Sequence, residues 1–264
     1  MGNYAAQLQL VRTLRPHPSA GFGIAPEIGA KSTSRPPPYD DSKDSFVVGP
    51  LRLELRPLVA LLSSQDLEIG ALKTRWGVYQ NISPVDVRGH FLLVPDLLSN
   101  TNCRGQTLTR NDCHDLVTVA TNIRPAGSAL LCYNSFGAGA SQNHFHCHLW
   151  PTPPIPLLET CTGVSWDCYA VSKAKVKSAI NLASSNVTVA PLSYPVCCIK
   201  ISENDEDDLV FVLASVVETI QSDLDAPHNV CLLNCPDGVD AYIFVRSKET
   251  SPSIAKGSKL GKAK

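Results

Sequence analysis

Short apolar runs bounded by turn residues alternate with helical periodicity in the middle of the chain. The runs GHFLLVP (89–95) and SALLCYNS (128–135) have the length and flanks of buried strands. Between them, apolar residues recur at helical spacing behind Thr109 and Asp112, which resemble a capping box. The pattern therefore predicts a helix over 110–123 that joins two strands.

A second apolar periodicity covers residues 205–224 behind an acidic cluster at 203–208. Acidic side chains stabilise the positive end of a helix dipole, so this segment is predicted to be an amphipathic helix. The runs VCLLNC (230–235) and AYIFV (241–245) flank the turn PDGVD and predict a β-hairpin. Hairpins with a few helices indicate the α+β class, with helices packed on a mostly antiparallel sheet.

Composition divides the chain into one domain and two flanking segments. Residues 1–45 are rich in Pro, Gly and Ser and include SRPPPYDDSKD, which predicts a poorly ordered or wrapping N-terminal arm. Residues 248–264 carry five lysines against one glutamate, which predicts a basic disordered tail. The folded domain is expected to span 46–247.

The charge balance removes two classes of partner. The 264 residues contain 23 Lys and Arg against 24 Asp and Glu, a net charge of −1, so nothing favours nucleic acid or an anionic membrane. The sequence shows neither a membrane-spanning run nor a secretory signal, and the protein is expected to be cytoplasmic.

Ten cysteines are spread along the chain. Without a secretory signal they are expected to be reduced and to pack as small hydrophobic residues. A zinc site is the alternative. Its candidate ligands are Cys103, Cys113 with His114, Cys161 with Cys168, and Cys231 with Cys235.

Three histidines alternate with apolar residues in YNSFGAGASQNHFHCHLWP (133–151). If this stretch is a strand, His144, His146 and His148 share one face, with neighbours about 6.6–7 Å apart, and the residues between them enter the core. Such a row can bind a metal, act in nucleophilic catalysis, or do neither.

The flanks of the histidines favour phosphate chemistry over a metal. They contain no carboxylate, so neither a metal nor another cofactor is predicted. The small residues at 137–141 let backbone amides approach an anion closely. A neutral imidazole beside a phosphate can attack phosphorus and form a covalent phosphoramidate intermediate.

These residues resemble a known family. His144 to Trp150 fits the histidine-triad pattern, and NSFGAGASQNH resembles the approach to it in the galactose-1-phosphate uridylyltransferase branch. YQNISPVDVRGHFLLVP (79–95) is similar to a segment of GDP-hexose phosphorylases, and APHNVCLLNCPDGVDAYIFVRS (226–247) looks like that family's closing hairpin. The resemblance implies a histidine-triad-like fold and covers about 79–247.

The resemblance also implies a mechanism. His146 would attack the α-phosphate of a GDP-hexose, with GDP-D-glucose the best fit, and release hexose 1-phosphate. Inorganic phosphate would then convert the guanylyl-histidine to GDP. His148 would contact phosphate, and His144 would brace His146 by hydrogen bonding. The residues implied in holding phosphate or ribose are Asn134, Gly139, Ser141, Gln142 and Asn143.

Two other functions stay open. A histidine-triad hydrolase of nucleoside polyphosphates or phosphoramidates would use water where the phosphorylase uses phosphate. A catalytically degenerate nucleotide-binding protein would keep the triad without turnover. His90, at the head of a predicted strand, is expected to be a hydrogen-bonded core histidine. A homodimer is a further expectation, because related folds complete sheets across subunits.

Overall fold

One antiparallel sheet organises the part of the chain that the structure describes. The computed structural model describes residues 35–46, 58–64, 72–81, 84, 86, 88–95, 103–140, 142–152, 188–192 and 197–245. Nine strands in this part form a single sheet in the order β1-β2-β3-β5-β4-β8-β9-β7-β6. The strands are β1 Leu58–Leu62, β2 Trp76–Gln80, β3 Phe91–Pro95, β4 Ala129–Asn134, β5 Cys147–Pro151, β6 Thr188–Leu192, β7 Cys197–Glu203, β8 His228–Cys235 and β9 Gly238–Val245.

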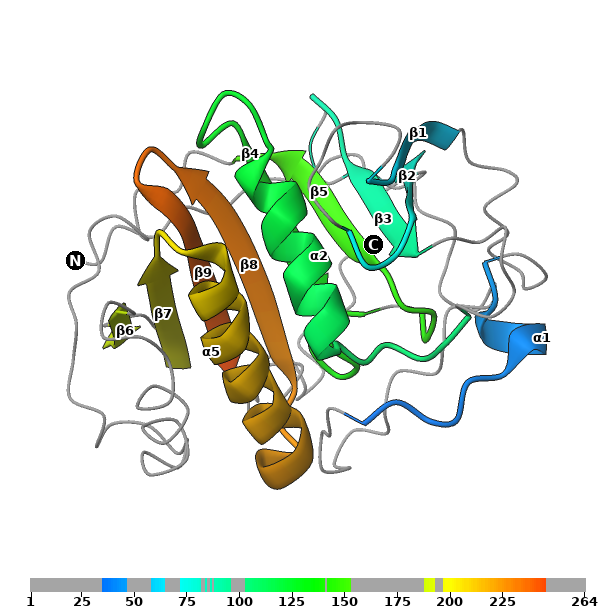
Figure 1. Ribbon diagram of the computed structural model, residues 1–264. Coiled ribbons are helices and arrows are strands. Elements are labelled where there is room, and N and C mark those ends of the chain that lie inside the picture. Colours follow the sequence, from blue (N-terminus) through cyan, green and yellow to red (C-terminus); the bar gives the residue numbers. More distant parts are fainter. Residues whose placement is uncertain are drawn as a thin grey trace, which may run out of the picture.

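Two helices lie side by side across one face of this sheet (Figure 1). They are α2, Arg110–Thr121, and α5, Glu206–Glu218, which continues as the π-helix η6, Thr219–Leu224. A short helix, α1, covers Asp41–Asp44 near the N-terminal end of the described residues. None of the helices in the described ranges has the length and apolar character of a membrane span.

The main core lies between the sheet and these two helices. Alternate residues, such as Leu131 and Tyr133 of β4, Cys147 of β5 and Phe145 just before β5, are buried there against α2 and α5. The residues between them point to the opposite side of the sheet. This side, called here the histidine face, carries Leu92 of β3, Cys132 of β4, His148 of β5 and Cys231 of β8, which the strand register sets in one row.

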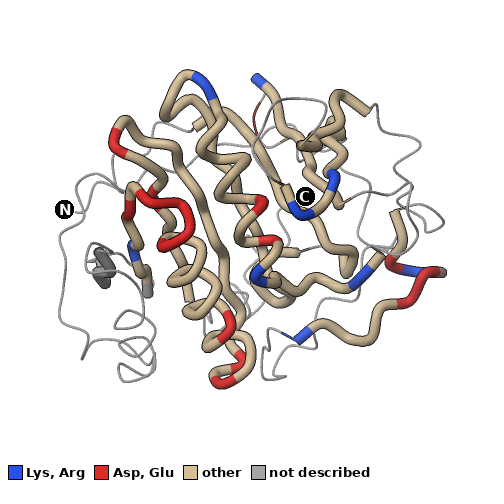
Figure 2. The backbone as a smooth tube through the Cα atoms, viewed as in Figure 1, with Lys and Arg blue, Asp and Glu red and all other residues tan. Residues whose placement is uncertain are grey.

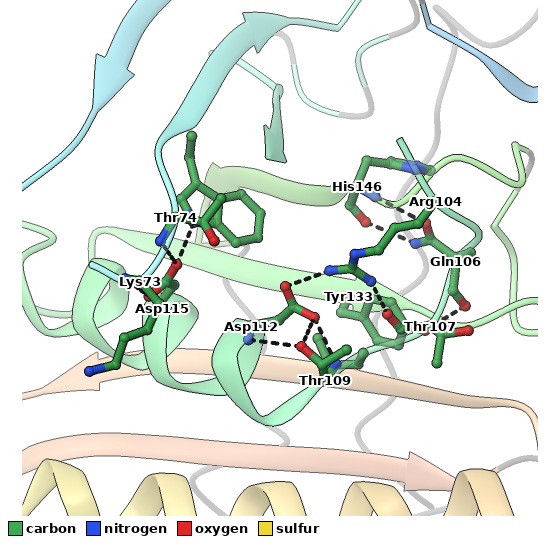
Figure 3. A network of polar contacts seen from close by, with 12 residues as sticks. Lys73, Thr74, Arg104, Gln106, Thr107, Thr109, Asp112, Asp115, Tyr133 and His146 are labelled. Atoms are coloured by element: carbon green, nitrogen blue, oxygen red, sulfur yellow. Dashed lines mark hydrogen bonds and ion pairs between the residues drawn. The ribbon is translucent and has the colours of Figure 1, made fainter. Parts of the chain in front are cut away.

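Asp115 of α2 ties the helix to the start of β2. Its carboxylate accepts hydrogen bonds from the Lys73 amide at 2.7 Å, the Thr74 amide at 2.9 Å and the Trp76 indole at 2.9 Å. Figure 3 shows the carboxylate between the helix and the segment that leads into β2. Because Asp115 and Trp76 are both buried, the contact fixes β2 against the core.

The α+β class predicted from the sequence is confirmed. The predicted helix over 110–123 corresponds to α2, and Thr109 and Asp112 form the complete capping box at its start. The predicted helix over 205–224 corresponds to α5 and η6, with Glu206, Asp207 and Asp208 in its first turn. Figure 2 shows this acidic cluster where α5 begins. The predicted hairpin is β8 and β9.

The expectation that all three histidines lie in one strand is wrong. Strand β5 begins at Cys147, so His148 is in the strand, whereas His144 and His146 precede it. The amide of Phe145 donates to the Arg104 carbonyl and the amide of His146 donates to the Gln106 side chain. These bonds to a loop replace the ladder bonds that would have extended the strand. The predicted alternation still holds, since Phe145 and Cys147 are buried in the core.

Parts of the predicted flanking segments lie outside the described residues. Of the arm predicted over 1–45, the structure describes 35–45, which pack against residues 142–144 through hydrogen bonds. The tail predicted over 248–264 lies outside the described ranges. The seven cysteines whose side chains the structure describes are free thiols, and Cys161 and Cys168 are not among them.

Candidate active site

His146 and His148 meet where β5 begins. Their ring centroids are 5.0 Å apart and the rings are inclined at 72°. Tyr133 pairs with Cys147 at the end of the β4–β5 ladder, and beyond it the Gln106 side chain donates to the carbonyls of both Asn134 and His146. The end of the ladder and the Gln106 side chain therefore bring His146, His148 and Asn134 together.

The His146 ring is held in one tautomer. Its Nδ1 lies 2.7 Å from the backbone carbonyl oxygen of His144, which can only accept a hydrogen bond. Nδ1 is therefore the protonated nitrogen, and in the neutral ring the lone pair is on Nε2. The sequence resemblance implied that His144 hydrogen-bonds to His146 but did not specify the atom. In the structure, the backbone carbonyl of His144 makes this hydrogen bond.

Gln106 fixes the backbone of His146. The side-chain oxygen of Gln106 accepts from the His146 amide at 3.0 Å, and its side-chain nitrogen donates to the carbonyls of His146 and Asn134 at 2.8 and 2.9 Å. Tyr133 donates its hydroxyl to the Gln106 carbonyl, as Figure 3 shows. Gln106 is fully buried, and sequence reasoning missed it because the segment CRGQTLTR carries no recognisable motif.

His90 of the loop before β3 contacts the third histidine. Its Nε2 lies 2.8 Å from Nδ1 of His148, and the side-chain nitrogen of Asn81 lies 3.2 Å from the same Nε2. Trp150 packs edge-on against His90 with ring centroids 5.0 Å apart. His90 is buried and hydrogen-bonded as expected, and its partner proves to be a candidate site residue.

The N-terminal segment 35–46 covers His144. Tyr39 places its hydroxyl 3.0 Å from Nδ1 of His144, and the Phe46 amide donates to the same nitrogen at 3.3 Å. Burial raises the pKa of Tyr39 well above its usual value, so the phenol stays protonated and can donate. The Phe46 ring also packs edge-on against His146, with centroids 5.5 Å apart. The segment therefore forms one wall of the site.

The side chains of Gln142 and Asn143 hold this segment. Gln142 donates to the carbonyls of Lys43 and Asp44, and Asn143 donates to the Pro37 carbonyl. Both residues were implied as ligands for phosphate or ribose, yet in this structure both side chains are buried in contacts with the protein itself. Ser141, implied in the same role, lies outside the described residues.

Asn134 and Gly139 frame the turn before the histidines. The Asn134 side-chain oxygen accepts a hydrogen bond from the side-chain nitrogen of Asn229 at 2.7 Å. The same nitrogen donates to the Ala138 carbonyl at 2.8 Å. Gly139 has φ +101°, a backbone conformation that favours glycine. A glycine at position 139 thus meets a backbone requirement.

The two strands that lead into and out of the site carry no charged side chain, and the described residues hold no metal cluster. Strands β4 and β5 contain no Lys, Arg, Asp or Glu, and Figure 2 draws them in tan. Within the described ranges, no three His, Cys, Asp or Glu side chains are placed to share a metal ion. The reactive groups that the described residues bring to the site are imidazole rings, and a neutral imidazole nitrogen can act as a nucleophile.

Two buried histidines predict a loss of stability in mild acid. Burial, with the neighbouring His146 second, lowers the pKa of His144 from 6.5 to about 3, and burial lowers that of His228 to about 4. The unfolded chain therefore takes up protons below pH 6.5 that the folded protein does not, so stability present at higher pH is lost as pH falls. We expect each ring to lower the free energy of unfolding by about 2 kcal/mol between pH 6.5 and 5.

Urea unfolding at pH 7.5 and 5.0 measures this effect. In the parent, the free energy of unfolding should be lower at pH 5.0 than at pH 7.5. In the His228→Phe variant this difference should be roughly half as large, because phenylalanine takes up no proton. An equal free energy of unfolding at both pH values in the parent protein would contradict the assignment of two neutral, buried rings.

Comparison with known proteins gives only distant similarity. No protein-family model matches the chain, and no curated protein matches it. Among solved structures, a DUF4931 family protein from Bacillus cereus is 15% identical, with a TM-score of 0.47 over 76% of this chain and 90% of that chain. A structure described as a uridylyltransferase is 13% identical, with a TM-score of 0.40 over 65% of this chain and 73% of that chain. At these TM-scores neither similarity assigns an activity.

Proposed function

We propose that this protein is a nucleotidyltransferase that works through a covalent nucleotidyl-histidine, with His146 as the nucleophile. One observation carries the proposal: His146 donates from Nδ1 to the His144 carbonyl, which leaves the lone pair of the neutral ring on Nε2. A nucleophile needs this lone pair on a defined atom and a partner that fixes its orientation. The buried Gln106 fixes the backbone of the same residue.

The same contact would stabilise the intermediate. When Nε2 attacks the α-phosphorus, the N–P bond forms, the bond to the bridging oxygen breaks, and the ring becomes positively charged. The His144 carbonyl already points its negative end at Nδ1–H, at 2.7 Å. A preorganised dipole aimed at developing charge lowers the barrier without reorganisation during the reaction.

The substrate is proposed to be a GDP-hexose, with GDP-D-glucose first. The segments 79–95 and 226–247, which resemble GDP-hexose phosphorylases, include the end of β2 and the whole of β3, β8 and β9. Attack on the α-phosphate would release hexose 1-phosphate. Inorganic phosphate would then attack the guanylyl-histidine, and breaking the N–P bond would give GDP and restore His146.

The test follows the labelled α-phosphate of GDP-D-glucose. The purified protein is incubated with the label, with and without inorganic phosphate, beside His146→Asn and the matched control His114→Asn on α2. Acid-labile label on the parent and the control, discharged as GDP by phosphate and absent from His146→Asn, supports the proposal. GMP release that does not need phosphate indicates a hydrolase, and no label from any nucleotide sugar indicates a binding protein.

His90 is expected to position His148 in this reaction. Replacing His90 with leucine removes the hydrogen bond to His148 Nδ1, a contact worth about 1.4 kcal/mol, so kcat should fall roughly tenfold while KM changes little. His90→Gln, which keeps a polar partner, should recover part of the loss. A parent-like kcat in His90→Leu, measured as phosphate-dependent GDP formation, would assign His90 to packing alone.

A further inference from the structure

Two thiols face each other on the histidine face, outside the reaction proposed above. Cys132 of β4 and Cys231 of β8 are register partners, and their sulfur atoms lie 3.1 Å apart. Both are free cysteines. Cys132 is also the register partner of His148 on its other side, so the thiol pair lies directly beside the third histidine.

The backbone at this position already suits a disulfide. Residues directly opposite in an antiparallel sheet have Cα atoms about 4.5 or 5.5 Å apart, and disulfides span about 4.4–6.8 Å between Cα atoms. The sulfur atoms must approach from 3.1 Å to a bond length of about 2 Å, which side-chain rotation supplies. A bond can therefore form without displacing either strand.

The two thiols differ in exposure. Cys132 is buried, at 3% exposed, and burial raises its thiol pKa well above the usual value, whereas Cys231 is partly exposed. An oxidant in solution therefore meets Cys231 first, and Cys132 is placed to attack the oxidised sulfur. Cys113 of α2 and Cys147 of β5 are buried in the core between the helices and the other face of the sheet, and neither can take this part.

We propose that Cys132 and Cys231 form a reversible redox site that takes a peroxide or a small-molecule disulfide as its oxidant. With hydrogen peroxide, the Cys231 thiolate displaces hydroxide and becomes a sulfenic acid. The Cys132 sulfur then attacks this atom, the S–S bond forms, and the hydroxyl leaves as water with the thiol proton. Two thiols and one peroxide give one disulfide and two waters, and the electrons lost by sulfur reduce the peroxide.

The site is tested by mapping the bond formed in the folded protein. The full chain is treated with graded hydrogen peroxide, or separately with glutathione disulfide, the free thiols are alkylated under denaturing conditions, and non-reduced peptides are analysed by mass spectrometry. We expect a linked pair of peptides containing Cys132 and Cys231, lighter by two hydrogens and separated by dithiothreitol. Cys113 and Cys147 should stay reduced at the same dose of oxidant and should therefore be recovered as alkylated cysteines.

Three variants distinguish this site from general thiol oxidation. Cys132→Ser should trap Cys231 as a glutathione adduct, because the second thiol is missing, and Cys231→Ser should leave Cys132 reduced. Cys235→Ser, which changes another partly exposed thiol of β8, should leave the cross-link unchanged. Three results would overturn the proposal. Cys231 of the parent could keep a stable glutathione adduct, Cys231 could bond to a different cysteine, or Cys132 and Cys231 could both stay reduced at a dose that oxidises Cys235. The outcome does not depend on whether His146 is nucleotidylated.

Discussion

The His146→Asn variant is expected to lose phosphate-dependent GDP formation by about ten-thousand-fold or more in kcat. Removal of a covalent nucleophile typically costs 10⁴ to 10⁶ in rate, because the route through the intermediate is lost as a whole. Asparagine keeps a side-chain amide that can donate to the His144 carbonyl, so the local fold should survive the change.

Two measurements separate loss of chemistry from loss of structure. The variant should unfold in urea at nearly the parent midpoint, and it should still bind GDP. The control His114→Asn, which alters a histidine of α2, should keep parent-like turnover. Residual kcat within tenfold of the parent in a folded His146→Asn protein would exclude His146 as the nucleophile and with it the covalent mechanism.

Asp115→Ala is expected to cause the largest loss of stability, about 3 to 5 kcal/mol. The carboxylate is 1% exposed and accepts hydrogen bonds from the amides of Lys73 and Thr74 and from the Trp76 indole. Without it, these donors are left in a buried position with no partner, and each unmatched donor costs about 1 to 3 kcal/mol. The attachment of β2 to α2 would be lost at the same time.

Chemical denaturation of the parent and the variant measures this loss directly. Asp207→Ala is the matched control: Asp207 is exposed in the first turn of α5, and its replacement should change the free energy of unfolding by no more than about 0.5 kcal/mol. A loss below 1 kcal/mol in Asp115→Ala would mean that water or another group replaces the carboxylate in the network.

Local pattern determined most of the central elements. The spacing of apolar residues predicted α2, β3 and β4, and Thr109 and Asp112 form the capping box that the sequence suggested. These predictions succeed because caps and periodicity are interactions within a few residues. Strands β1 and β2 were not predicted, since residues 58–62 and 76–80 belong to the sheet through pairing with segments that are distant in sequence.

The candidate site divides in the same way. By itself, the alternation of histidines with apolar residues determined that Phe145 and Cys147 enter the hydrophobic core. Only the tertiary structure decided that β5 begins at Cys147, because the loop around Gln106 takes the hydrogen bonds of the preceding residues. It also decided that His90 meets His148 and that Tyr39 meets His144. The last two contacts join residues 58 and 105 positions apart, and strand register and segment packing set such contacts where local spacing cannot.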